Sequence, residues 1–246
     1  MDDTFLLPGE RLDEVNERLC LIQKPQGLTF GTDALLLAAF VRPAPTAQAL
    51  ELGGGSGIVS LLLCARDKCR TVLCAEIQPD YVDLIRRNVL CNRMQDRIFP
   101  CQADVRQDAA FTAGGFDLVF TNPPYLPVGS GPENVNDGKN IARREVAGSI
   151  ADFARAAGRA LRYGGAFYCV YLPERLADLL AALRSAGIEP KRLRTVHPTP
   201  AAAPVLLLLE GRRGGRPGLR FEAPFVLSDK GSNTPAMEAL LQSGQM

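Results

Sequence analysis

The sequence lacks the ligand clusters that mark most metal sites. Its 246 residues include one histidine, His197, and seven cysteines, none of which forms a Cys-x-x-Cys pair. A structural zinc site needs four ligands, usually in closely spaced pairs. Most of the cysteines lie in apolar segments such as "LLLCA" and "TVLCAEI", where a thiol typically serves as a small buried hydrophobe. We therefore expect no bound metal, and reduced cysteines of the kind found in reducing compartments.

Long apolar runs are also missing. The sequence has no stretch of about 18 or more uncharged apolar residues, so no transmembrane helix is predicted. The first residues, "MDDTFLLPGERLDE", are acidic and lack the basic and apolar regions of a signal peptide. These features predict a cytoplasmic protein without a membrane partner.

The charge is unevenly distributed along the chain. The net charge is only +1, yet residues 1–138 carry a net −6, residues 139–220 a net +9 and residues 221–246 a net −2. A locally basic segment on a nearly neutral chain indicates one face suited to an anionic partner. An ordinary solvated surface would give the same composition, so charge alone leaves both interpretations open.

From residue 48 onward, short apolar segments alternate with helical patterns. Strands are predicted in the segments 47–55, 71–77, 97–104, 116–122, 166–172, 191–198 and 203–211, and helices in 57–67, 79–92, 149–161 and 173–187. Such alternation indicates an α/β fold with a mostly parallel sheet and helices on both faces.

The expected organisation is one domain over residues 1–246. Residues 1–47 are an N-terminal extension that packs on the core. Within this extension, "FGTDALLLAAFV" predicts a helix capped by Thr32 or Asp33. Residues 48–210 form the core, and residues 211–246 comprise a basic, glycine-rich loop and a C-terminal segment.

The segment "ELGGGSG", residues 51–57, ends the first core strand and opens a helix. Gly53, Gly55 and Gly57 allow sharp turns and a close approach of a ligand to the backbone. Glu76 closes the next strand, 19 residues after Gly57, where a carboxylate can accept hydrogen bonds from both ribose hydroxyls. The combination favours a nucleoside ligand over a purely structural turn.

The loop does not have the spacing of a dinucleotide site. Its glycines alternate, and the loop begins with an acid, Glu51, which would repel a pyrophosphate. A carboxylate there suits a cationic ligand, and S-adenosylmethionine carries both a sulfonium and an ammonium group. Asp104, after the third core strand, could accept from an adenine amino group or could cap a helix; both interpretations stay open.

A second unusual loop, Asn122-Pro123-Pro124-Tyr125, follows the strand "FDLVFT". Two prolines remove two backbone donors and fix two φ angles, so the loop is stiff. The Asn122 side-chain carbonyl and the Pro123 carbonyl could hold both N–H groups of an exocyclic amine and direct its lone pair. Tyr125 could stack on a flipped-out base, an interaction of about 1–3 kcal/mol. The alternative is a rigid turn with a buried tyrosine.

In their order and spacing, "ELGGGSG", "AEIQ", "QAD" and "TNPPY" resemble the class I S-adenosylmethionine-dependent aminomethyltransferases. The resemblance implies a Rossmann-like, seven-stranded, mostly parallel sheet with an antiparallel last strand. The segments "FGTDALLLAAF", "IARREVAGSIADF", "EPKRLRTVHP" and "KGSNTPAM" further resemble the bacterial family that N6-methylates the adenine next to the anticodon of a valine tRNA. S-adenosylmethionine as cofactor and an RNA, specifically tRNA, as partner are implied.

The resemblance also implies roles for individual residues. The implied cofactor site comprises Phe30, Gly31, Thr32, Asp33, Glu51, Gly53, Gly55, Gly57, Glu76, Ile77, Asp104 and Val105. The implied catalytic loop comprises Asn122, Pro123, Pro124 and Tyr125. The implied RNA-binding residues are Lys139, Arg143, Arg144, Lys191, Arg192 and Arg194, and strand alternation places Arg192 and Arg194 on one face. For His197 we expect a structural or RNA-contact role rather than acid–base catalysis.

One residue departs from the family pattern, and three functions compete. Gly54 stands where related loops often carry a hydroxyl or another small residue, so we expect it to be tolerated with some loosening of the loop. The competing functions are methylation of adenine N6 in tRNA, the same chemistry on an rRNA base or a protein glutamine, and a non-catalytic RNA-binding module. An intact cofactor loop and an intact amine-binding loop argue against the last.

Overall fold

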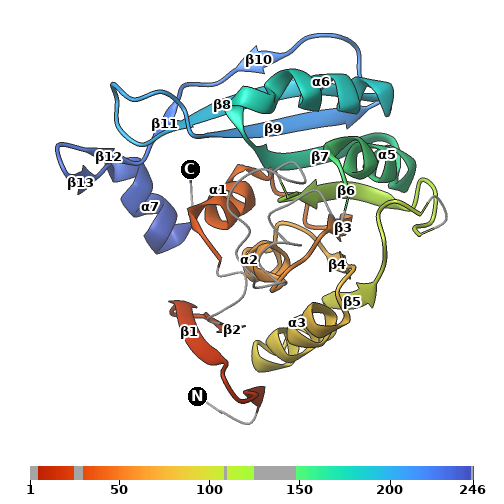
Figure 1. The fold of residues 1–246 in the computed structure, drawn as a ribbon, viewed down its shortest axis with the longest axis vertical. Coiled ribbons are helices and arrows are strands. Elements are labelled where there is room, and N and C mark those ends of the chain that lie inside the picture. The colour runs from red at the N-terminus through yellow and green to blue at the C-terminus, as the bar shows by residue number, and fades with distance from the viewer. Residues whose placement is uncertain (1–4, 25–29, 108–109, 125–147, 245) are drawn as a thin grey trace, which may run out of the picture.

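A sheet of nine strands forms the centre of the molecule (Figure 1). The computed structural model describes all residues except 1–4, 25–29, 108–109, 125–147 and 245. The strands of this sheet are β3 (Gln48–Leu52), β4 (Thr71–Glu76), β5 (Ile98–Gln102), β6 (Phe116–Thr121), β7 (Leu161–Tyr171), β8 (Ile188–His197), β9 (Leu206–Arg213), β10 (Arg220–Phe221) and β11 (Phe225–Val226). Their order is β10-β8-β9-β7-β6-β3-β4-β5, with β11 also paired to β8.

The seven longer strands confirm the predicted fold class. The strands β3, β4, β5, β6 and β7 pair in parallel with one another, whereas β9 is antiparallel to both β7 and β8. The strand with the weakest sequence pattern, β5, contains Pro100 and pairs only with β4 at the edge of the sheet, where a proline is tolerated. β10 and β11 are two-residue segments that the sequence did not predict, because they are too short to show a period.

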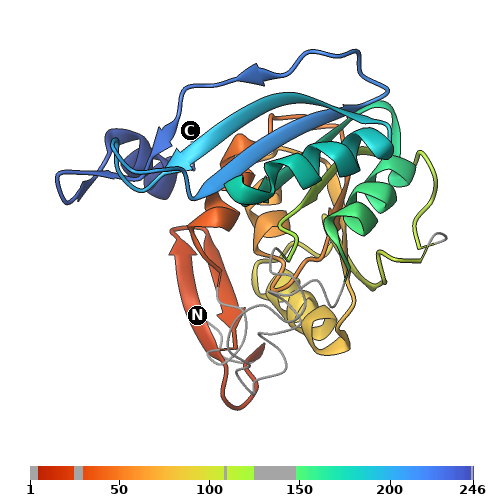
Figure 2. The same cartoon turned by 45° about the horizontal axis from the view of Figure 1, so that its top comes forward.

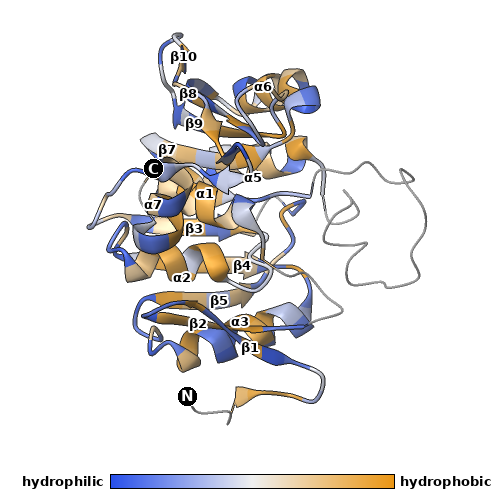
Figure 3. Ribbon diagram, turned by 90° about the vertical axis from the view of Figure 1, so that its left-hand side faces the viewer, coloured by the Kyte–Doolittle hydropathy of each residue, from blue (hydrophilic) through white to orange (hydrophobic). Residues whose placement is uncertain are grey.

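Helices cover both faces of the sheet. They are α1 (Thr32–Phe40), α2 (Ile58–Ala65), α3 (Pro79–Cys91), α5 (Ile150–Ala160), α6 (Leu176–Ser185) and α7 (Pro235–Ser243), with a short 3-10 turn at Pro173–Arg175. One core lies under α1, α2, α3 and α7, and the other lies under α5 and α6. Hydrophobic residues, orange in Figure 3, gather in α1, α2 and the strands beside them. Side-chain alternation along β3 sends Leu50 and Leu52 toward α5 and Ala49 toward α2.

The N-terminal caps of α1 and α5 differ. α1 begins at Thr32 with Gly31 in the cap position, so the prediction that Thr32 or Asp33 caps this helix is wrong. α5 begins with a full capping box, in which the Ser149 hydroxyl accepts from the Asp152 backbone N–H and the Asp152 carboxylate accepts from that of Ser149. Within the described ranges, no helix combines the length and the hydrophobicity required to cross a membrane.

The N-terminal extension contains a hairpin that the sequence did not predict, formed by β1 (Arg11–Asn16) and β2 (Leu19–Gln23). Figure 2 shows it standing beside the sheet rather than within it. Asn88 of α3 accepts from the Ile22 backbone N–H at 2.6 Å and donates to the Ser56 carbonyl at 2.9 Å. At the end of α3, Asn92 accepts from the Cys20 N–H at 3.0 Å. Asn88 therefore joins the hairpin to the glycine loop.

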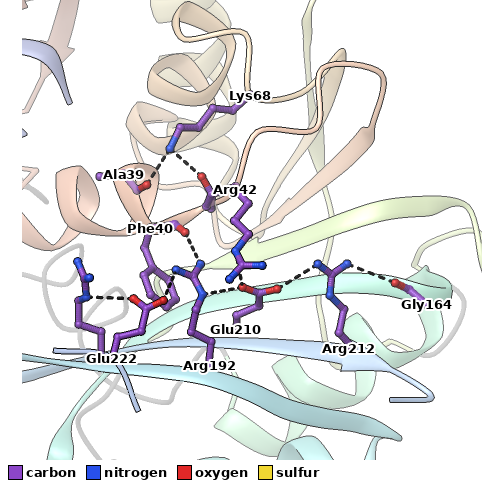
Figure 4. A network of polar contacts seen from close by, with 11 residues as sticks. Ala39, Phe40, Arg42, Lys68, Gly164, Arg192, Glu210, Arg212 and Glu222 are labelled. Carbon is purple, nitrogen blue, oxygen red and sulfur yellow. Dashed lines mark hydrogen bonds and ion pairs between the residues drawn. The ribbon is translucent and has the colours of Figure 1, made fainter. Parts of the chain in front are cut away.

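The C-terminal end of α1 is fixed by two cations (Figure 4). The buried Lys68 ammonium donates to the carbonyls of Ala38, Ala39 and Val41 at 2.7–2.8 Å. The Arg192 guanidinium donates to the Phe40 carbonyl at 2.7 Å and lies 3.8 Å from the centre of the Phe40 ring. Cations at a helix C-terminus satisfy its last carbonyls and complement the helix dipole. α1 is thereby held against β8 through Arg192 and against the turn between α2 and β4 through Lys68.

Candidate active site

Four parts of the predicted site lie at the carboxyl ends of four neighbouring strands: the glycine loop, Glu76, Asp104 and Asn122. Leu52 at the end of β3 is paired with Ala75 of β4 and with Thr121 of β6, and Glu76 is paired with Gln102 of β5. The buried Thr121 hydroxyl donates to the Leu52 carbonyl at 2.7 Å, which fastens the ends of β3 and β6 together. Loops at this edge of an open parallel sheet typically form the ligand site.

The glycine loop adopts the conformation for which its glycines are needed. Gly53, Gly55 and Gly57 have φ values of 73°, 55° and 81°, in the left-handed region that other residues rarely enter. The backbone N–H groups of Gly53 and Gly54 both donate to the Ala75 carbonyl at 2.9 Å. Gly57 then occupies the cap position of α2, so that the loop leads directly into a helix N-terminus.

Glu76 lies against this loop. One carboxylate oxygen accepts from the Gly55 N–H at 3.0 Å and the other accepts from the Gln78 N–H at 2.9 Å. A carboxylate offers about four acceptor sites, so these two bonds leave capacity for ribose hydroxyls. The contact between Glu76 and Gly55 agrees with the inference that both serve one nucleoside ligand.

Glu51 does not have its predicted place. Its side chain is 2% exposed and lies beneath the loop, where its carboxyl accepts from the Ser60 hydroxyl and from the Cys74 thiol at 3.2 Å. Strand alternation turns it toward α2, away from the edge of the sheet. This position beneath the loop does not support the prediction that Glu51 lines the cofactor site. Burial raises the pKa of the Glu51 carboxyl from its ordinary value of 4.5 to about 7.

We expect Glu51→Gln to stabilise the protein above pH 7 and to change its stability much less near pH 5. Because the folded-state pKa is raised, the contribution of Glu51 to stability falls as the pH rises from 4.5 to about 7. A shift of this size corresponds to about 3 kcal/mol at high pH. Urea unfolding of both proteins at several values between pH 5 and 9 measures the effect, since other titrations cancel in the difference. A difference that does not vary with pH would contradict it.

Gly54 has a packing role that the sequence did not indicate. A Cβ atom at this position would lie 2.4 Å from Cys74 Sγ and 3.2 Å from Ile85 Cδ1. The thiol of Cys74 thus occupies the space that a side chain at position 54 would need. The loop is therefore closely packed and not loosened, because Gly54, the fourth glycine of the loop, leaves room for the Cys74 thiol.

Gly54→Ala should therefore destabilise the protein by about 1–3 kcal/mol through overpacking. Combining it with Cys74→Ala should recover much of that loss, because the second change removes the obstructing sulfur. Chemical denaturation of the two single variants and the double variant gives the coupling free energy. Simple additivity of the two single effects would show that the contact between positions 54 and 74 is not the cause.

Asp104 follows β5 and caps a turn rather than a helix. Its carboxylate accepts from the Arg106 backbone N–H at 2.9 Å and from the Arg106 guanidinium at 2.7–3.0 Å, which holds the pKa of Asp104 below its ordinary value. The Ala103 N–H donates to the Glu76 carbonyl at 3.0 Å and keeps this turn beside Glu76. Next to it, Val105 is buried in the core under α5. The half-buried Ile77 follows Glu76 directly.

Asn122 contacts α1, although the two belong to the last and the first of the predicted site motifs along the chain. The Asn122 amide nitrogen donates to Asp33 Oδ2 at 2.7 Å, across 89 residues of sequence. Pro123 and Pro124 are buried, whereas Tyr125 lies outside the described residues. The backbone N–H of Phe30 donates to the Gln23 side chain at 2.9 Å, which ties the start of the "FGTD" segment to the hairpin. The sequence predicted both Asn122 and Asp33 as site residues, but it did not predict the hydrogen bond between them.

The predicted RNA-binding residues are only partly supported. Arg192 pairs with Glu210 at 2.8 Å and with Glu222 at 3.0 Å, and its side chain is 13% exposed. Arg194 pairs with Glu222 at 3.1 Å. Arg192 and Arg194 do share a face, but they use it for internal ion pairs, so their assignment to an RNA-binding surface is corrected.

The remaining basic residues differ from this pair. The half-buried Lys191 of β8 donates to the Arg216 carbonyl at 2.9 Å. Three further residues of the predicted set, Lys139, Arg143 and Arg144, lie outside the described residues.

His197 contacts the Ala202 carbonyl at 2.8 Å and the Thr195 hydroxyl at 2.9 Å, as expected for a structural histidine. In the part of the chain that the structure describes, His, Cys, Asp and Glu side chains form no group of three or more able to hold a metal ion.

Comparison with known proteins identifies the family. The family model for the methyltransferase small domain matches residues 26–175, a range that covers more than half of the chain. It includes the "FGTD" segment, the glycine loop, Glu76 and the Asn-Pro-Pro-Tyr loop. This chain belongs to the methyltransferase small domain family.

Curated relatives of this methyltransferase share one name. A protein of Escherichia coli O157:H7 (strain EC4115 / EHEC) is 29% identical over 67% of this chain and 66% of its own length, which is just under two thirds. A protein of Citrobacter koseri is 30% identical over 75% of this chain and 76% of its own length. Both are named tRNA1(Val) (adenine(37)-N6)-methyltransferase.

Solved structures resemble this methyltransferase across most of the chain. A protein from Agrobacterium tumefaciens, described as a predicted O-methyltransferase, has a TM-score of 0.70 and 25% identity, and the match covers 87% of this chain and 96% of that one. A tRNA m1G37 methyltransferase from M. jannaschii has a TM-score of 0.58 at 15% identity over 85% of this chain and 58% of its own, and shows the shared fold alone.

The family indicates S-adenosylmethionine as the cofactor of this methyltransferase. The residues present fit it. The loop from Gly53 to Gly57 lets a ligand approach the backbone, and the Glu76 carboxylate beside it suits the ribose hydroxyls. The acid at the start of α1, Asp33, lies at the same edge of the sheet through its contact with Asn122.

Proposed function

We propose that this protein methylates the N6 amine of an adenine next to the anticodon of a tRNA. The observation that carries the proposal is the position of Asn122 and Pro123. They follow β6 directly, and β6 is paired with β3, the strand that leads into the glycine loop. The shared name of the curated relatives supports the choice of adenine N6 in tRNA over other amines.

The chemistry that we propose is mainly one of positioning. When bound, the cofactor supplies a methyl group that is already activated by a sulfonium, so proximity and orientation supply most of the rate enhancement. An exocyclic amine is a poor nucleophile because its lone pair is delocalised into the ring. The Asn122 side-chain carbonyl and the Pro123 carbonyl would accept its two N–H groups and direct the lone pair at the methyl group. The burial of Pro123 and Pro124 favours fixed acceptors.

We propose that Lys139, Arg143, Arg144 and Lys191 contact the RNA. The support for this assignment is the net charge of +9 on residues 139–220, which suits a phosphate backbone. Arg192 and Arg194 are left out of this set, because acidic side chains of the same chain neutralise them. Such a reaction would take place in the cytoplasm.

A hydroxyl is the rival substrate, because one structural neighbour is described as a predicted O-methyltransferase. A hydroxyl has a single proton and gains little from two neighbouring acceptors, whereas an amine uses both. The paired acceptors at Asn122 and Pro123 therefore favour the amine.

Nucleoside mass spectrometry on tRNA and rRNA from a deletion strain tests the proposal. We expect the loss of N6-methyladenosine from one tRNA, and its return when wild-type protein, but not Asn122→Ala, is supplied. Loss of a methylated rRNA base or of a ribose methyl group would replace the proposed substrate. Unchanged nucleosides in both RNA classes would reject methylation of RNA.

A further inference from the structure

The hydrogen bond between Asn122 and Asp33 distinguishes the two ends of the Asn122 amide. A carboxylate can only accept hydrogen bonds, so the atom that lies 2.7 Å from Asp33 Oδ2 is the amide nitrogen. The carbonyl oxygen Oδ1 then lies at the other end of the planar amide group, pointing away from Asp33 Oδ2. Without such a neighbour, the nitrogen and oxygen positions are nearly equivalent in shape, and only hydrogen bonding decides between them.

We propose that Asp33 is the positioning residue that turns the Asn122 carbonyl, and not its amide nitrogen, toward the substrate amine. This inference rests on the proposed function. The amine presents two N–H donors, so an Asn122 flipped by 180° would oppose donors with donors. Holding one amide rotamer in advance keeps an acceptor in place before the substrate arrives, which is the preorganisation that positioning catalysis requires.

The surroundings of Asp33 fix its carboxylate. Its Oδ1 accepts from the Ala34 backbone N–H at 2.9 Å, so that each carboxylate oxygen has a named donor. Asp33 lies in the first turn of α1, where the helix dipole favours a negative charge. A Cβ atom at position 31 would lie 2.8 Å from Asp33 Oδ1, so a glycine at this position leaves room for the carboxylate.

Contacts at the C-terminal end of α1 keep the helix, and with it Asp33, in a fixed position relative to the sheet. Lys68 and Arg192 bind the last carbonyls of α1, and Arg192 is itself paired with Glu210 of β9 (Figure 4). α1 is thus attached to the sheet at its C-terminal end by these cations and at its N-terminal end by the contact of Asp33 with Asn122. Arg192, which the sequence assigned to RNA, contributes to the frame that holds Asp33.

A cofactor-lining role for Asp33 makes a different prediction from the positioning role. If Asp33 acts only through the cofactor, the losses in single-turnover rate caused by Asp33→Ala and Asn122→Ala should multiply. If it acts through Asn122, Asp33→Ala should slow methyl transfer at least tenfold in the wild-type background and less than twofold in the Asn122→Ala background. Rates are compared at saturating cofactor, and the dissociation constant of S-adenosylmethionine is measured calorimetrically for each variant.

Exchanging the two side chains gives a second, more demanding test. Asn122→Asp alone would place two carboxylates against each other and should lower the rate sharply. Adding Asp33→Asn restores one donor and one acceptor across the contact, with a carboxylate oxygen now available to accept from the amine. We expect the exchanged pair to be at least tenfold faster than Asn122→Asp alone. If the exchanged pair is as slow as Asn122→Asp or slower, the positioning role is rejected.

A measurement without turnover separates this inference from the proposed function. In full-length protein labelled with ¹⁵N-asparagine and saturated with S-adenosylhomocysteine, the Asn122 side-chain NH₂ signals are assigned by their disappearance in Asn122→Ala. We expect Asp33→Ala to shift these signals and to speed their exchange with water, while the signals of Asn88 stay in place. Unchanged Asn122 signals would overturn the inference whatever the substrate. Shifted signals in a protein that methylates no RNA would uphold it and would reject only the proposed substrate.

Discussion

Asn122→Ala should lower the rate of methyl transfer by roughly a hundred- to a thousandfold, which corresponds to about 2.7–4 kcal/mol by analogy with the loss of one oxyanion-hole donor. The side-chain carbonyl acts on the substrate amine, so the loss should appear in turnover and not in cofactor binding. Single-turnover methylation of tRNA, together with calorimetric titration of S-adenosylmethionine, measures both quantities.

The matched control is Asn92→Ala, the same substitution at the end of α3. Asn92 holds the backbone of Cys20 in the hairpin through its amide. Its loss should reduce stability and leave the rate of methyl transfer near that of the wild type. Near-normal chemistry in Asn122→Ala would show that the Asn-Pro-Pro-Tyr loop is only a rigid turn.

Glu76→Ala should weaken the binding of S-adenosylmethionine about ten- to a hundredfold, because charge-assisted hydrogen bonds of about 1.5–3 kcal/mol are lost. At saturating cofactor, the single-turnover rate should fall much less than it does in Asn122→Ala. Titration calorimetry gives the dissociation constants, and thermal unfolding shows whether the variant keeps its fold.

Two further variants sharpen the result for Glu76. Glu76→Gln keeps the shape and one acceptor oxygen, so its affinity should lie between those of the wild type and Glu76→Ala. Asp80→Ala removes an exposed acid four residues later in α3 and should leave the affinity unchanged. An unaltered dissociation constant in folded Glu76→Ala would remove Glu76 from the cofactor site.

The parts of the site that the sequence predicted depend on local rules. Gly53, Gly55 and Gly57 were selected because such turns need positive φ, and all three have it. Glu76 was selected because it closes the strand after the loop, and parallel strands carry their ends to one edge. Spacing and backbone geometry are properties of a short segment, so a single sequence is sufficient to show them.

The parts that the sequence missed depend on contacts between distant segments. Glu51 lies on the face of β3 that packs against α2. The packing of the strand, and not the charge of a ligand, decides on which face it lies. The partners of Arg192 come from positions 210 and 222, and those of Asn122 from position 33. The hairpin is held by Asn88 and Asn92 of α3 rather than by a strong pattern of its own. None of these pairings has a local signature.

The most direct test of the central claim follows an isotopic methyl group. Purified protein is incubated with S-adenosylmethionine labelled with deuterium in the methyl group and with unmodified tRNA, and the digested nucleosides are analysed by mass spectrometry. We predict labelled N6-methyladenosine from the wild-type protein and a roughly hundred- to thousandfold lower yield from Asn122→Ala at early times. Label on a ribose oxygen, on another base, or on no nucleoside at all would contradict the claim that this loop directs methylation of an adenine amine.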